Sequence, residues 1–195
     1  RARLRDGERE HAREARDADV ALFYYSGHAI QFAGVNYLAP VDAMLADEAD
    51  LRRMLRLDGI VADIEQARRL RIVVLDACRD NPLQSADRRS VGNNRGLAQG
   101  TPARGVFSIY SAGFGQTALD RLGPDDSSPN SVFTRVFAEK LASPGLDLRA
   151  IATQTRAAVV GMTQRIGHDQ FPAYYDQIVG DDIVFAAADS GSQNT

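Results

Sequence analysis

The stretch Arg71-Ile-Val-Val-Leu-Asp-Ala-Cys-Arg-Asp-Asn-Pro82 decides the fold. Its residues Ile72 to Leu75 form a short, continuous apolar run, which is typical of a strand buried on both faces of a parallel sheet. The only cysteine of the chain, Cys78, follows that run between two aspartates. A thiol that only filled a core would be expected inside the run. Because sites in open α/β sheets gather beyond the carboxyl ends of strands, this position points to a functional thiol.

Further apolar runs predict the rest of the sheet. Two strands are expected at Asp19 to Tyr25 and Gly105 to Ser111, and a short last strand at Asp182 to Ala186. The segment Ile30 to Val41, with Gly34 between two partly apolar arms, favours a hairpin. The strand predicted at Arg71 to Leu75 is expected to end before Cys78.

Segments with helical periodicity separate these strands. In the segment Asp47 to Leu70, Ile60, Ile64 and Ala67 recur at spacings of four and three and predict one apolar face. Asn130 or Ser131 is a suitable N-cap for the helix expected at Ser131 to Leu141. This alternation predicts an α/β domain with a mostly parallel central sheet. The expected helices are Arg1 to Asp17, Asp47 to Leu70, Ser131 to Leu141 and Leu146 to Met162.

Composition narrows the class of protein. A chain of 195 residues with 44% hydrophobic and 25% charged residues fits one globular domain. Its net charge of -3 argues against nucleic-acid binding, and its apolar runs are too short to span a membrane. The N-terminal residues are polar, unlike a signal peptide, and a single cysteine forms no internal disulfide. We therefore expect a cytoplasmic protein that contacts neither nucleic acid nor membrane.

His28 is the histidine that matches the thiol in position. It lies just beyond the predicted strand Asp19 to Tyr25, 50 residues before Cys78. Parallel strands bring their carboxyl ends to one edge, so the imidazole and the thiol are expected to face each other there. An imidazole favours the thiolate and acts as general base and acid in acyl transfer, and strand-end N–H groups can stabilise an oxyanion. In the competing interpretation, Cys78 is an inert packing residue and His28 a loop residue.

Six blocks of sequence resemble the caspase-like cysteine peptidases, in particular bacterial orthocaspases, metacaspases and paracaspases. The resemblance implies a caspase-like three-layer α/β/α sandwich. It also implies that His28 and Cys78 form a catalytic dyad, with the backbone N–H groups of Ala29 and Cys78 as the oxyanion hole. The blocks are Phe23 to His28, Asn36 to Asp42, Val74 to Pro82, Gly105 to Asp120, Asn130 to Thr134 and Gln170 to Pro172.

At two positions this chain has a residue that differs from the one found in many members of the family. Many relatives have glycine where this chain has Ala29, and caspases have glutamine where it has Asp76. In metacaspases and paracaspases an aspartate there lines the pocket for the residue before the cut. The resemblance thus implies cleavage after arginine or lysine, since a buried carboxylate favours a guanidinium partner. Asp120 aligns with a second acidic wall of that pocket, whereas a solvated loop carboxylate is the competing interpretation.

The resemblance also divides the domain. Residues 1–82 correspond to the large-subunit part, 83–104 to a mobile intersubunit loop, 105–187 to the small-subunit part and 188–195 to a tail. The resemblance implies that the opening strand, helix and strand of the family have no counterpart here. We therefore expect the chain to be either a fragment or the partner of a separate, cleaved segment. The loop holds arginines suited to self-cleavage, although scattered charges in a solvated loop explain any single one: Arg88, Arg89, Arg95 and Arg104.

We expect no metal or organic cofactor in this chemistry. Some metacaspases require calcium, but Asp125-Asp126 and Asp181-Asp182 lack the spacing of a dedicated site. His11 and His168 lack a cysteine partner for zinc. The expected partners are peptides with a basic residue before the cut, together with the missing segment or a sensor or adaptor domain. A catalytically silent scaffold and another thiol-based acyl hydrolase or transferase are the alternatives.

Overall fold

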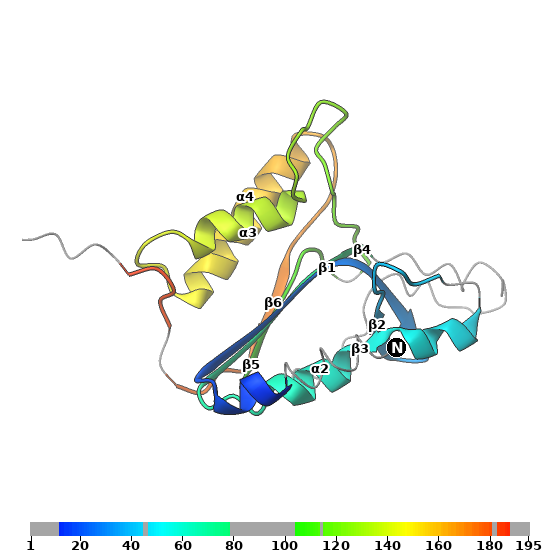
Figure 1. The fold of residues 1–195 in the computed structure, drawn as a ribbon. Helices are drawn as coiled ribbons and strands as arrows, with labels where there is room; N and C mark the ends of the chain where they lie inside the picture. Colours follow the sequence, from blue (N-terminus) through cyan, green and yellow to red (C-terminus); the bar gives the residue numbers. More distant parts are fainter. Residues whose placement is uncertain (1–11, 45–46, 79–103, 114, 181–182, 188–195) are drawn as a thin grey trace, which may run out of the picture.

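A six-stranded mixed sheet forms the centre of the molecule (Figure 1). The computed structural model describes residues 12–44, 47–78, 104–113, 115–180 and 183–187. The spatial order of the strands is β3-β2-β1-β4-β5-β6. Their bounds are β1 (Val20–Phe32), β2 (Val35–Leu38), β3 (Leu55–Arg56), β4 (Leu70–Cys78), β5 (Val106–Tyr110) and β6 (Ala173–Asp176).

Helices cover both faces of this sheet. The central strands β1, β4 and β5 are parallel, whereas β2, β3 and β6 pair antiparallel at the two sides. Helix α2 (Leu57–Ile64) packs on one face, and α3 (Val132–Leu141) and α4 (Leu148–Gln164) pack on the other (Figure 1). This arrangement confirms the expected three-layer α/β/α architecture, with its parallel part confined to the three central strands.

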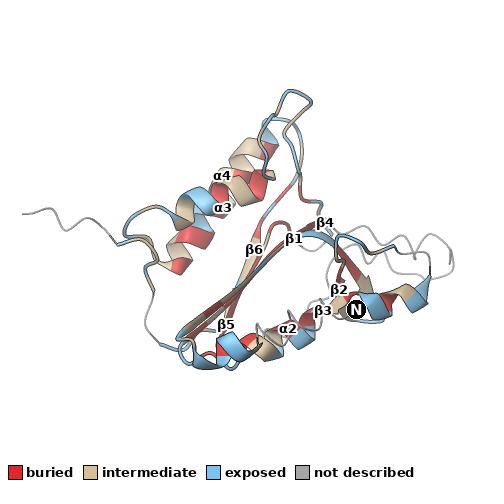
Figure 2. Cartoon of the chain, in the orientation of Figure 1, coloured by how far each residue is buried: buried red, intermediate tan, exposed pale blue. Residues whose placement is uncertain are grey.

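Strand β4 is buried on both faces, as its apolar run predicts. One row of its side chains, including Val73 and Leu75, packs with Ile60, Ile64 and Ala67. The alternate row packs against α3 and α4. Figure 2 accordingly colours this strand as buried. Because successive residues of a strand point to opposite faces, a continuous apolar run serves two helical layers at once.

The local signals at turns and caps are confirmed. Ala33 (φ 48°) and Gly34 (φ 80°) form the two-residue turn between β1 and β2, a conformation with two positive φ angles that matches the twist of a hairpin. Ser131 is the N-cap of α3, and its hydroxyl accepts the Thr134 N–H at 2.9 Å. Asp147 caps α4 in the same way.

Several boundaries differ from the prediction. Strand β1 continues beyond Tyr25 to Phe32, because β2 provides a second partner where β4 ends. The predicted helix Asp47 to Leu70 divides into a 3-10 helix at Glu48–Arg53, the short β3, and α2. Strand β6 was not predicted. Of the predicted last strand Asp182 to Ala186, the described residues form only an isolated bridge at Val184.

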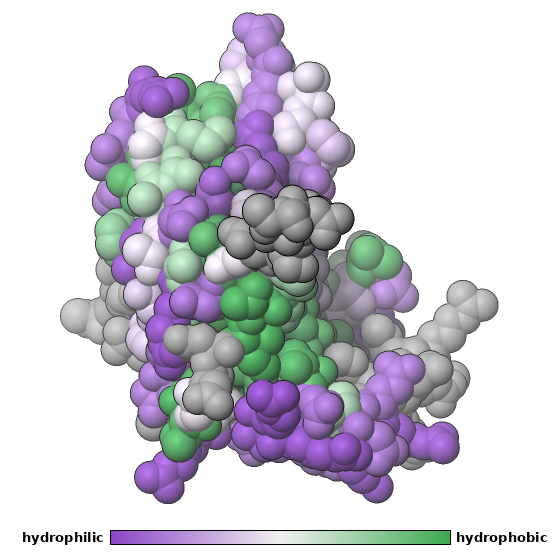
Figure 3. All heavy atoms as spheres, turned by 90° about the vertical axis from the view of Figure 1, so that its left-hand side faces the viewer, coloured by the Kyte–Doolittle hydropathy of each residue, from purple (hydrophilic) through white to green (hydrophobic). Residues whose placement is uncertain are grey.

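The surface in Figure 3 is polar along its lower edge, with strongly hydrophobic residues gathered near the middle of the same face. No helix within the described residues is long and apolar enough to cross a membrane. Of the predicted N-terminal helix Arg1 to Asp17, residues 12–17 are described and are helical, and Ala15 packs into the core beneath α2. The tail 188–195 lies outside the described residues.

Candidate active site

Backbone register brings the two predicted dyad residues together. Strands β1 and β4 are parallel neighbours, and their last paired positions are His28 and Cys78. Neighbouring strands lie about 5 Å apart, so two positions 50 residues apart in sequence become adjacent at one rim of the sheet. We call His28 and Cys78, the last pair of the β1–β4 ladder, the dyad rim. Cys78 is the last residue of β4 and not a loop residue beyond it, which corrects the predicted strand end.

The His28 backbone is held firmly while its side chain is exposed. The Tyr25 hydroxyl lies within hydrogen-bond distance of the carbonyl oxygens of His28 (2.7 Å) and Ala39 (2.8 Å), and the Ala39 N–H donates to the His28 carbonyl at 2.9 Å. Burial raises the pKa of Tyr25, so the phenol stays protonated and able to donate. Gly27 makes this packing feasible, because a Cβ there would come 2.8 Å from the Tyr25 hydroxyl oxygen, at a φ of +155°.

Ala29 is buried and faces Leu38 of β2 in the register. The His28 carbonyl accepts a hydrogen bond from the β2 side, and successive residues of a strand direct their backbone groups to alternate sides. The Ala29 N–H therefore points to the β4 side, where the backbone of Cys78 lies. This geometry is compatible with the predicted oxyanion role of Ala29.

Asp76 is buried, with 5% of its surface exposed, and its carboxylate contacts the first turn of α3. Oδ2 accepts hydrogen bonds from the Ser131 hydroxyl and from the Thr134 hydroxyl, the latter at 2.6 Å. Oδ1 has no hydrogen-bond partner among the described residues. The N-terminus of a helix also stabilises an anion, so Asp76 does not require a cation to be buried. Burial of Asp76 therefore does not by itself imply a basic substrate.

Asp120 is exposed and lies in the loop between β5 and α3. The neighbouring Leu119 anchors that loop, since its N–H donates to the Gln170 Oε1 at 3.1 Å and its carbonyl accepts the Val132 N–H at 3.1 Å. Val132 in turn follows Ser131, which bonds to Asp76. Asp76 and Asp120 thus approach the same helix end from different segments.

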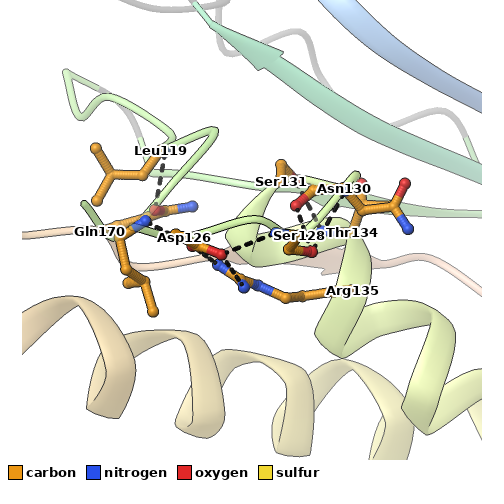
Figure 4. Close-up of polar contacts among 9 residues, drawn as sticks. Leu119, Asp126, Ser128, Asn130, Ser131, Thr134, Arg135 and Gln170 are labelled. Carbon is orange, nitrogen blue, oxygen red and sulfur yellow. Dashed lines mark hydrogen bonds and ion pairs between the residues drawn. The ribbon is translucent and has the colours of Figure 1, made fainter. Parts of the chain in front are cut away.

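The carboxylate of Asp126 holds the loop between β5 and α3 against α3 (Figure 4). Arg135 donates to both of its oxygens, at 3.0 and 2.6 Å, and the Leu122 and Ser128 N–H groups donate to it as well. These bonds, with Arg135 as the largest cause, hold the pKa of Asp126 well below its usual range. We call Asp76, Asp126, Ser131, Thr134 and Arg135 the α3 anchor.

The other predicted site residues lie in different parts of the chain. Arg104 is exposed just before β5, whereas Arg88, Arg89 and Arg95 lie outside the described residues. The described part of the chain holds no group of three His, Cys, Asp or Glu side chains able to bind a metal. His168 bonds to the Thr117 carbonyl at 2.8 Å. His11, Asp181 and Asp182 are not described.

Sequence reasoning missed the residues that support these groups. The sequence predicts only a strand at Tyr25 and only a helix cap at Ser131. The signal for Ser131 was partly visible, because a cap hydroxyl beside a second hydroxyl three residues later can serve a buried acid. No local pattern indicated that Thr134 and Tyr24 contact each other, since 110 residues separate them.

Comparison with known proteins identifies the family and the fold of the chain. A family model described as "Caspase domain" matches residues 1–182. Among solved structures, caspase-1 from Spodoptera frugiperda is similar, with 15% identity and a TM-score of 0.56 over 95% of this chain and 73% of that one. The structure titled "pro-sf-caspase-1" gives 13% identity and a TM-score of 0.54, over 95% and 73%. No curated protein matches. The chain therefore belongs to the caspase-domain family of cysteine peptidases.

Proposed function

We propose that this protein is an endopeptidase that cuts peptide bonds after arginine or lysine, with Cys78 as nucleophile and His28 as general base and acid. The observation that carries the proposal is the register pair of these two residues at the end of the parallel β1–β4 ladder. A nucleophile and its base must lie within hydrogen-bond reach during the reaction, and neighbouring rungs of a sheet allow this.

The reaction follows from these two groups and water. His28 accepts the thiol proton, and the Cys78 sulfur bonds to the peptide carbonyl carbon. The carbon–nitrogen bond then breaks, His28 protonates the departing amine, and a thioester remains. Water loses a proton to His28 and attacks the thioester, which releases the acid and restores the thiol. The Ala29 and Cys78 N–H groups are the proposed donors to the carbonyl oxygen as it gains charge.

Asp76 and Asp120 are the proposed acceptors of the substrate's basic side chain. Two observations support Asp76: it stands two positions before Cys78 on β4, and its Oδ1 has no partner among the described residues. Asp120 is exposed and is held near the same helix end through Leu119. A guanidinium or ammonium between two carboxylates would gain charge-assisted hydrogen bonds.

The same specificity would extend to the chain itself. Arg104 is exposed and directly precedes the glycine before β5, so it is accessible to a peptidase of this type. Cleavage there would fall at the edge of the proposed intersubunit loop 83–104. Bacterial orthocaspases remain the branch that we propose for the chain, on the strength of the sequence resemblance.

The test is a panel of fluorogenic peptides that differ only in the residue before the cut: arginine, lysine, citrulline, aspartate or asparagine. We expect release after arginine and lysine, little after the neutral isostere citrulline, and none with Cys78→Ala. Asp76→Asn should reduce the preference for arginine over citrulline, whereas Asp125→Asn, at an exposed loop position, should not. Cleavage after aspartate would refute the pocket assignment, and no cleavage of any peptide would favour a silent scaffold.

A further inference from the structure

A chain of hydroxyl groups joins the two catalytic strands to helix α3. Tyr24 of β1 lies with its hydroxyl 2.7 Å from the Thr134 hydroxyl, and Thr134 donates to Asp76 of β4 at 2.6 Å. Ser131, the N-cap residue, donates to the same carboxylate oxygen. Figure 4 shows Ser131 and Thr134 together at the start of α3.

The number of hydroxyl protons determines which group donates in each hydrogen bond of this chain. A hydroxyl carries one proton, and the proton of Thr134 goes to the carboxylate of Asp76, which when ionised can only accept. The Tyr24 hydroxyl must therefore donate to Thr134. Donors chained in one direction polarise one another and strengthen the terminal bond to a charged acceptor. Asp76 thus receives two hydroxyl protons at Oδ2, while Oδ1 receives none from the described residues.

We propose that Thr134 is a specificity-determining positioning residue: its hydroxyl, oriented by Tyr24, fixes the Asp76 carboxylate so that Oδ1 is presented to a basic substrate side chain. This inference rests on the proposed function, in which Asp76 reads the charge of that side chain. Two bonds to one oxygen restrict rotation of the carboxylate about its last torsion, which is otherwise broad. A pre-oriented acceptor discriminates a guanidinium from a neutral isostere better than a rotating one.

Thr134 is the informative member of the chain. Ser131 also caps α3, so its loss would combine a capping effect with any effect on Asp76. In the cap, the backbone N–H of Thr134 donates to the Ser131 hydroxyl, so the Thr134 side chain takes no part in capping. Valine replaces threonine with nearly the same shape but without the hydroxyl, and the backbone cap is retained.

The experiment compares kcat/KM for two peptides, one with arginine and one with citrulline before the cut. We expect Thr134→Val to lower the arginine-to-citrulline ratio about tenfold, the factor typical of one lost hydrogen bond to a charged group. Thr134→Ser should restore the ratio, and Tyr24→Phe should lower it less, because only the orienting donor is lost. The ratio separates specificity from damage to the dyad, because damage to the dyad lowers the rates with both peptides in proportion.

Thr155→Val is the matched control. Thr155 lies fully buried on α4, and its hydroxyl has no hydrogen-bond partner among the described residues. The same chemical change there should leave the ratio unchanged and preserve folding.

The possible outcomes test the proposed function and the positioning role of Thr134 separately. If the parent enzyme fails to prefer arginine to citrulline, the proposed function is wrong. If the parent discriminates and Thr134→Val discriminates equally well, the positioning role of Thr134 is wrong and the function stands. A Thr134→Val variant that loses both peptides in proportion, with Thr134→Ser failing to rescue, also contradicts the proposal.

Discussion

The dyad rim and the α3 anchor lie at neighbouring parts of the sheet but are held in different ways. His28 and Cys78 are brought together by backbone register, and the His28 imidazole is exposed without a hydrogen bond to a described residue. In the α3 anchor, side chains make the connections, with Asp76 and Asp126 accepting from hydroxyl, guanidinium and backbone donors. The comparison teaches that the proposed dyad depends on the backbone ladder, whereas the loop geometry and the proposed specificity depend on side-chain bonds.

The largest effect should come from the core that supports the α3 anchor. Phe133 is fully buried, stacks on Phe137 at a centroid distance of 5.7 Å, and directly precedes Thr134. We expect Phe133→Ala to lower the free energy of unfolding by about 3–5 kcal/mol because it leaves a cavity. Denaturant unfolding measures this change. Phe133→Leu, which retains most of the volume, should cost far less, and equal losses would show that packing is not the cause.

Gly27 offers a direct way to disturb the dyad rim. Alanine there would meet the Tyr25 hydroxyl and would adopt an unfavourable φ. We expect a loss of about 1–3 kcal/mol in the free energy of unfolding and a fall in kcat, because the His28 backbone must shift. Gly34→Ala is the control, since Gly34 has a positive φ but open space around its Cβ position. If both variants lose the same activity, backbone strain alone explains the result.

Tyr25→Phe should produce a smaller change at the same rim. It removes the hydroxyl that bonds to the carbonyl oxygens of His28 and Ala39. The expected cost is about 1 kcal/mol, with a lower kcat and an unchanged arginine-to-citrulline ratio. Tyr175→Phe on β6 is a matched substitution, because its hydroxyl makes no hydrogen bond with a described residue. A changed ratio in Tyr25→Phe would show that the two regions are not independent.

The smallest effect is expected at Asp126, and it should depend on pH. The pKa of Asp126 is lowered in the folded protein, so its contribution to stability is fully present above the ordinary carboxyl pKa of about 4 and is lost as pH falls through the folded value. Asp126→Asn should therefore lower the melting temperature at pH 7 and matter less at lower pH. The exposed Asp125→Asn serves as control. A difference from the parent protein that is constant with pH would contradict the assignment.

The sequence predicted what local patterns encode. The apolar run of β4 predicted burial on both faces, and the spacing of Ile60, Ile64 and Ala67 predicted one packed side. Parallel strands with polar residues at their ends predicted that His28 and Cys78 would meet. Tertiary contacts decided the remainder. The extension of β1 depends on β2, and β6 is stabilised by its pairing with β5, including Phe107 stacked on Tyr174.

The partners of Asp76 illustrate the limit most clearly. The sequence marks an aspartate before the thiol but not the hydroxyls that bond to it, which come from 55 and 58 residues further along the chain. From sequence alone, a substrate cation is the expected partner of the buried carboxylate, whereas the structure also provides two hydroxyl donors. Long-range hydrogen bonds of this kind leave no periodic signal in a single sequence.

The most direct measurement of the central claim is the rate of alkylation of Cys78 by iodoacetamide between pH 5 and 9. Because the chain has one cysteine, the label reports on that thiol alone. We predict that the parent protein stays reactive well below pH 8, whereas His28→Ala follows the ordinary thiol pKa of about 8.5. Identical profiles in the two proteins would contradict the pairing of His28 with Cys78.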